Sequence, residues 1–123
     1  MIVPLLAFIA GCKSEFYSES DFLKVDKVDS HMHMFGEKTY FAEAARKDNF
    51  RLININVDHA SREVVNNQHR YGTDAVKKYP GIVYYSTTFF FDTTGWGTPA
   101  WSERVISELK STLDADPVSV KIW

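Results

Sequence analysis

The chain has 123 residues, a net charge of −2 at pH 7 and a pI near 6.0, with 45% hydrophobic and 24% charged residues. These proportions are ordinary for a folded globular domain, and the length allows one domain of modest size. Lys and Arg are scattered along the sequence and form no basic stripe, so nucleic acid is not an expected partner.

The N-terminal segment, residues 1–12, is almost wholly apolar up to Gly11 and ends at Cys12. It is too short to span a bilayer, which takes about 20 residues, but it fits the apolar region of a secretion signal. The alternative is an apolar tail or strand with a buried free cysteine. Cys12 is the only cysteine, which excludes an internal disulfide and a zinc–thiolate cluster. Residues 13–21 are predicted to form a polar tether.

The remaining residues, 22–123, alternate between predicted strands and predicted helices. Period-two patterns predict strands at 22–29, 51–58, 82–91 and 118–123, and spacings of three and four predict helices at 37–48, 61–79 and 98–116. Crossovers of this kind indicate a parallel sheet with the helices outside it, either an open doubly wound sheet or part of an eight-stranded barrel. No glycine-rich phosphate-binding pattern follows the first strand, which argues against the dinucleotide-binding form of the open sheet.

Two histidines, His31 and His33, follow the first predicted strand one residue apart. Side chains alternate between faces in an extended chain, so both imidazoles are expected to point the same way, with Asp29 behind them on that face. Two converging imidazoles at a strand end make half of a metal site. The alternative is a pair of half-buried loop histidines.

Other polar residues lie near the ends of the predicted elements. By the same alternation, Asn56 and Asp58 of the second strand are expected to approach the edge of the sheet where His31 and His33 lie. Lys121 lies on the fourth strand, on the face opposite its apolar residues. His59 is predicted to be a solvated loop residue, and His69 a surface residue of the second helix.

The segment Lys27-Val-Asp29-Ser-His31-Met-His33 resembles the amidohydrolase superfamily, and most closely its amidohydrolase-related branch of metal-dependent hydrolases and decarboxylases. The similarity runs from about Phe22 to the end. It implies the N-terminal half of a (β/α)8 TIM barrel, with about four parallel strands and three helices, in a partial amidohydrolase-like domain at 22–123. A full barrel takes about 250 residues, so the sequence predicts an incomplete barrel and a fragment of a longer protein.

The resemblance also implies roles for the candidate residues. His31 and His33 are expected to bind a divalent metal ion, with Zn2+ the ion that the resemblance implies, and to leave an open position for water. Asp29 is expected either to be the carboxylate that orients the pair or to be a first-strand residue that only packs. Lys121 is either a bridging ligand, a residue that supports a metal ligand or faces the substrate, or a structural lysine. The general base and the other ligands are expected beyond the chain end, so no catalytic residue is assigned and the fragment is expected to be inactive.

The implied function is a hydrolase in which metal-activated water attacks a carbonyl-type carbon of a small-molecule substrate. The alternatives are a decarboxylase of the same branch and a non-catalytic binding lipoprotein. Ile9-Ala10-Gly11-Cys12 resembles the lipobox of bacterial lipoproteins, so Cys12 is the predicted lipidation site. A bacterial cell-envelope location with membrane contact through that lipid anchor only is then expected, and a homo-oligomer is left open.

Overall fold

The computed structural model describes residues 16–57 and 59–122. Their elements are η1 (Glu19–Asp21), β1 (Lys27–Met32), α1 (Tyr40–Lys47), β2 (Phe50–Ile55), α2 (Arg62–Lys78), β3 (Val83–Thr87), α3 (Pro99–Thr112), η2 (Leu113–Ala115) and β4 (Ser119–Val120). The segment 1–12, with Cys12, and the first three tether residues lie outside the described part of the chain.

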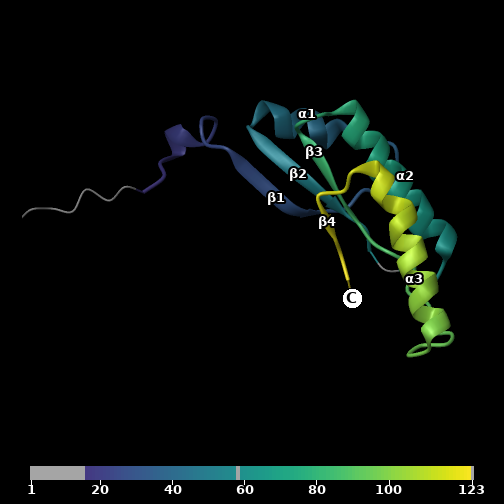
Figure 1. Cartoon of the computed structure of the whole chain (residues 1–123). Helices are drawn as coiled ribbons and strands as arrows, with labels where there is room; N and C mark the ends of the chain where they lie inside the picture. Colours follow the sequence, from purple (N-terminus) through teal and green to yellow (C-terminus); the bar gives the residue numbers. More distant parts are fainter. Residues whose placement is uncertain (1–15, 58, 123) are drawn as a thin grey trace, which may run out of the picture.

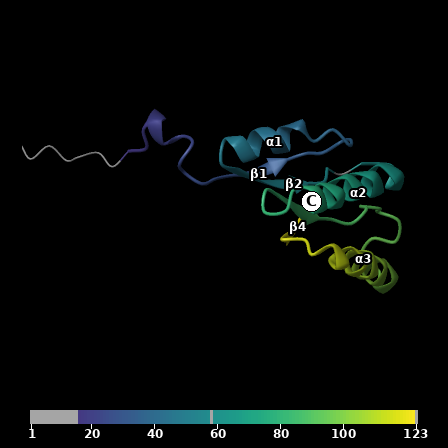
Figure 2. The ribbon, with the colours of Figure 1, turned by 90° about the horizontal axis from the view of Figure 1, so that it is seen from above.

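The four strands form one parallel sheet in the order β1-β2-β3-β4 (Figure 1). Figure 2 shows this sheet curled as a half-barrel, with α1, α2 and α3 in an arc outside it. A doubly wound sheet reverses its strand order at a switch point. The described strands follow chain order without a reversal, so the predicted parallel α/β fold with outer helices is confirmed.

The start of β1 differs from the sequence prediction, because residues 22–26 form a turn and the strand begins at Lys27. The Lys27 ammonium donates to the backbone oxygens of Phe22 and Val25. Phe22 also packs edge-on against Phe50, with 6.2 Å between ring centroids. Phe22 therefore packs at the amino end of the sheet, while Leu23 and Val25 stay exposed, and the segment does not extend the first strand.

The third and fourth strands are shorter than predicted. β3 ends at Thr87 because only Ser86 and Thr87 pair with β4, which has two residues. Beyond β3 the chain leaves the sheet, and Phe89 packs edge-on against Trp101 at 6.5 Å. The aromatic run that predicted a longer strand therefore packs against the start of α3.

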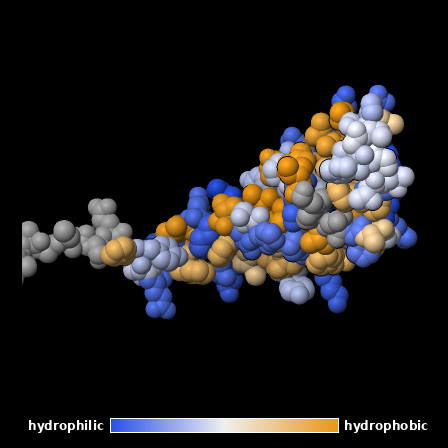
Figure 3. Space-filling model, turned by 90° about the horizontal axis from the view of Figure 1, so that it is seen from below, coloured by the Kyte–Doolittle hydropathy of each residue, from blue (hydrophilic) through white to orange (hydrophobic). Residues whose placement is uncertain are grey.

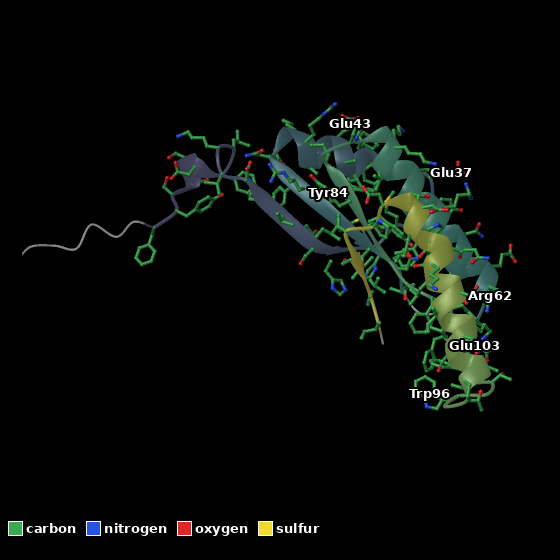
Figure 4. The ribbon with its side chains drawn as sticks, viewed as in Figure 1. Glu37, Glu43, Arg62, Tyr84, Trp96 and Glu103 are labelled. Carbon is green, nitrogen blue, oxygen red and sulfur yellow. The ribbon has the colours of Figure 1, made fainter. Side chains whose placement is uncertain are left out.

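The loop between β3 and α3 is held by α3. Arg104 donates from Nη1 to Asp92 Oδ2 at 3.0 Å and from Nη2 to the Thr94 oxygen at 3.3 Å. The Trp101 indole donates to the Asp92 oxygen at 2.6 Å and stacks on Trp96 at 4.4 Å. Figure 4 shows Trp96 at the far end of α3, away from the sheet.

The core lies between the sheet and the helices α1 and α2. Its buried residues are Met34, Ala42, Ala45, Leu52, Ala75, Tyr79 and Val83. Gly72 of α2 allows a close approach to the sheet, because a Cβ there would lie 2.6 Å from Asn54 Nδ2 and 2.6 Å from the Tyr85 ring. Asn54 and Tyr85 are paired in register on β2 and β3, and both are buried.

Candidate functional site

His31 and His33 converge at the carboxyl end of β1. Their ring centroids are 4.9 Å apart and their planes are perpendicular. The carboxyl ends of the strands lie on the lower side of the sheet in Figure 1. Figure 3 views the molecule from that side and shows apolar and polar side chains interspersed on the surface. The structure thus brings together the two imidazoles that the sequence singled out.

The neighbouring strand holds one nitrogen of the His33 ring. Its Nδ1 lies 2.8 Å from the backbone oxygen of Ile55, at the end of β2. A carbonyl oxygen only accepts hydrogen bonds, so Nδ1 is the donor, and in the neutral ring Nε2 keeps a free lone pair. Metal-binding histidines commonly donate their second N–H to a carbonyl in this way. His33 is therefore held in the tautomer that can bind a cation through Nε2.

An irregularity in β1 changes the surroundings of Asp29. Asp29 pairs with Leu52, and pairing resumes at Met32 with Asn54. Between these two pairs β1 advances by three residues and β2 by two, so β1 contains one extra residue. One extra residue reverses the faces that follow it. The alternation that placed Asp29 on the histidine face therefore does not run unbroken. Asp29 Oδ1 accepts from the backbone N–H of His31 at 3.0 Å, which holds the backbone beside the pair. Its predicted orienting role stays a prediction.

Lys121 follows β4 and extends its ladder with β3. Its backbone N–H donates to the Thr87 oxygen at 2.7 Å, and its own oxygen accepts from Thr88 Oγ1 at 2.8 Å. The side chain is partly buried. Whether Lys121 bridges metal ions, supports a ligand, faces the substrate or is structural stays a prediction. Asp58, the other residue expected at this edge from β2, lies outside the described residues.

The expected position of Asn56 is wrong. Asn56 was expected at the histidine edge, but its Nδ2 donates to the Tyr85 hydroxyl at 2.8 Å. Tyr85 also contacts α2, since the space at Gly72 is bounded by its ring. Asn56 is therefore buried on the helix-covered face of the sheet.

The surface position predicted for His69 is also wrong, because the residue is half-buried between α2 and the sheet. Its Nδ1 lies 2.9 Å from the Tyr85 hydroxyl, and burial lowers the pKa of the imidazole below 6.5. Burial likewise raises the pKa of Tyr85 above 10.0. His69 lies four residues after Val65 and three before Gly72, both buried, so helical spacing alone could have placed it inward. His59 is exposed, as predicted.

A cavity of about 620 Å³ opens beside His33, between the loop after β1 and the start of α1. Phe35, Tyr40 and Tyr71 supply aromatic walls, and Phe35 lies 5.9 Å from His33 between ring centroids. Cavities of roughly 300–1,000 Å³ are typical of small-molecule sites. Space for a small molecule therefore adjoins one of the two imidazoles.

Within residues 16–57 and 59–122, no three or more His, Cys, Asp or Glu side chains form a group that could hold one metal ion. None of the described helices is long and apolar enough to cross a membrane.

In comparisons with known proteins, the chain matches no protein-family model, no curated protein and no solved structure.

Proposed function

We propose that the half-barrel belongs to a (β/α)8 barrel of the amidohydrolase-related type, a metal-dependent hydrolase of small molecules in which His31 and His33 bind a divalent metal ion, preferably zinc. Parallel strands in chain order with helices outside support this architecture. Sites in such barrels lie at the carboxyl ends of the strands, which is where the pair lies.

The observation that carries the proposal is the bond between His33 Nδ1 and the Ile55 oxygen, at 2.8 Å. The adjacent strand thereby holds Nδ1 as a donor, which leaves Nε2 of the neutral ring as the nitrogen available to a metal ion. A solvated loop histidine has no need of that constraint. The second imidazole lies 4.9 Å away between ring centroids, close enough for both rings to face one ion.

Each residue then has a defined task. His33 binds through Nε2 while Ile55 holds its other nitrogen, and Asp29 holds the backbone from which His31 projects. Bound zinc supplies a water whose pKa is lowered to about 7. Catalytic zinc usually has three protein ligands, so the proposal requires a further ligand and a base besides this pair. The adjoining cavity is the proposed place for the substrate.

Metal binding is the direct test. The chain is titrated with Co2+, whose visible absorption reports coordination, and then with Zn2+ in competition. We expect binding by the wild type and a loss of at least about tenfold in affinity for His31→Ala and for His33→Ala, since even disturbing the support of a ligand costs about 10–100-fold. His59→Ala is the matched control, because His59 is exposed in a loop. Equal affinity in all four proteins would refute the assignment.

Hydrolysis is tested on a protein in which the barrel is complete, with small esters, lactones and amides as substrates. We expect zinc-dependent product release that His33→Ala abolishes and His59→Ala leaves unchanged. Metal binding without any such release would keep the metal site and reject the hydrolase.

A further inference from the structure

The cavity of about 620 Å³ beside His33 has walls that are largely aromatic. Phe35 comes from the loop after β1, and Tyr71 comes from α2. Tyr40 and Phe41 are the first two residues of α1. Three separate segments of the chain thus place aromatic rings around one space. Cavities that bind small molecules are typically lined in this way, by aromatic and apolar side chains with a few polar groups among them.

Two of these rings are open to a ligand. Tyr40 is 77% exposed and Phe35 is 64% exposed. Tyr40 stands edge-on to Phe41, with 6.1 Å between ring centroids, and Phe41 in turn packs against the core. Phe35 lies 5.9 Å from His33 between ring centroids. Both exposed rings therefore rest on other aromatic rings, while apolar surface stays in water that an apolar ligand would favourably cover.

The loop that carries Phe35 is tied to the helix that carries Tyr71. Arg70 Nη1 of α2 donates to Glu37 Oε1 at 3.4 Å, and Figure 4 shows Glu37 beside α2. The Arg70 guanidinium also lies 4.5 Å from the centre of the Tyr71 ring. These contacts connect two of the three aromatic segments at the cavity.

The charged groups at the cavity disfavour a cationic ligand. Glu37 lines the cavity, but its carboxylate is paired with Arg70. Lys38 lines the same cavity and adds an exposed ammonium group. The charge left over at this wall is therefore positive.

We propose that the substrate carries an aromatic ring without positive charge, and that this ring binds against Phe35 and Tyr40. The inference rests on the hydrolase function proposed above and names the class of its substrate. His33 lines the same cavity, so a ring bound here leaves the rest of the molecule beside the proposed metal ion. Paired aromatic rings gain more than the burial of their apolar area alone, which favours an aromatic ring over a saturated ring of the same size.

The test uses the full chain, kept free of metal, with benzyl alcohol as the probe. Binding is followed by NMR at the backbone amides of Gly36 and Lys38, two residues of the cavity wall. Cyclohexylmethanol has nearly the same size without the aromatic ring, and benzylamine adds a positive charge. We expect saturable shifts with benzyl alcohol, an affinity roughly two- to tenfold lower for cyclohexylmethanol, and weaker binding of benzylamine than of benzyl alcohol.

Substitutions by leucine separate aromatic contact from general apolar contact. Phe35→Leu and Tyr40→Leu each keep an apolar side chain but remove one ring, so each should reduce the preference for benzyl alcohol over cyclohexylmethanol. Both residues are exposed, so the fold should tolerate the changes. Tyr17→Leu is the matched control, because Tyr17 is an exposed tyrosine before η1 and its replacement should leave the preference unchanged.

Three outcomes would overturn the aromatic site. These are amide signals that do not move with benzyl alcohol, equal affinities for benzyl alcohol and cyclohexylmethanol, and a preference that survives in both leucine variants, which would place the ring elsewhere. Benzylamine binding more tightly than benzyl alcohol would reject the limit on charge. His31→Ala should weaken Co2+ binding and leave the binding of benzyl alcohol unchanged, so the aromatic site and the metal site fail or survive separately.

Discussion

The close approach of α2 to the sheet at Gly72 gives the sharpest quantitative prediction. Gly72→Ala adds one methyl group in the middle of a helix, where alanine is ordinarily preferred to glycine by about 1 kcal/mol. The methyl would lie 2.6 Å from Asn54 Nδ2 and 2.6 and 2.8 Å from two carbons of the Tyr85 ring. Real Cβ atoms do not approach other atoms this closely, so helix preference and packing oppose each other at this position.

Packing should win, because both neighbours are buried and the Tyr85 ring is held in place. Asn54 is fully buried and Tyr85 is 1% exposed, with its hydroxyl held by two hydrogen bonds. Overpacking a tight interior costs about 1–3 kcal/mol, and contacts under 3 Å with two immobile side chains put this case near the upper end. After the helix preference is subtracted, we expect the free energy of unfolding to fall by about 1–2 kcal/mol.

Urea and thermal unfolding followed by circular dichroism measure this loss, and each kcal/mol corresponds to roughly 4–8 °C in Tm for a domain of this size. Asn66→Ala is the control, since Asn66 is exposed on the same helix and the change should be neutral or slightly stabilising. A Gly72→Ala protein as stable as the wild type, or more stable, would refute the packing argument.

A double-mutant cycle identifies the clash. Asn54→Ala removes one of the two groups that the added methyl meets. In that background Gly72→Ala should cost less than in the wild type, with a coupling of at least about 0.5 kcal/mol, as is usual for residues in contact. Additive effects would show that the methyl is accommodated by movement of α2 instead.

Two further predictions concern the outer face and the α3 loop. Burial lowers the pKa of His69 in the folded protein, so on acidification below pH 6.5 this residue is protonated first in the unfolded chain. The free energy of unfolding should therefore decrease as the pH is lowered from 6.5 to the pKa of His69 in the folded state. His69→Gln should flatten this dependence in urea titrations, and an unchanged pH profile would contradict the burial. Arg104→Met should free the loop that it holds through Asp92, seen as increased acrylamide quenching of Trp96 with little change in Tm; quenching equal to the wild type would show that the aromatic stack alone holds the loop.

Much of the fold was predictable from the sequence, but the boundaries of its elements were not. The order of strands and helices follows from hydrophobic periodicity, and the parallel sheet follows from that order. Residues 22–26 alternate like a strand, yet in the structure the Phe22 ring packs against Phe50 and its backbone oxygen accepts a hydrogen bond from Lys27. Local periodicity does not report such contacts, because the partner lies elsewhere in the chain.

The histidine pair shows the same division. Its position after the first strand, and the convergence of the two rings, could be predicted from alternation along the chain. The bond from His33 to Ile55 and the irregularity beside Asp29 could not, since both depend on how β1 pairs with β2. The tautomer on which the proposed metal site depends is thus set by a neighbouring strand.

Alternation along the second strand predicts that Asn54 and Asn56 share one face and that Ile53 and Ile55 share the other. It did not determine which face meets the helices. The packing of α2 on the sheet placed the asparagines under this helix, where Gly72 leaves room for Asn54 and the Tyr85 hydroxyl accepts a hydrogen bond from Asn56. A period of two fixes a pair of faces, while packing against a partner decides which of them is buried.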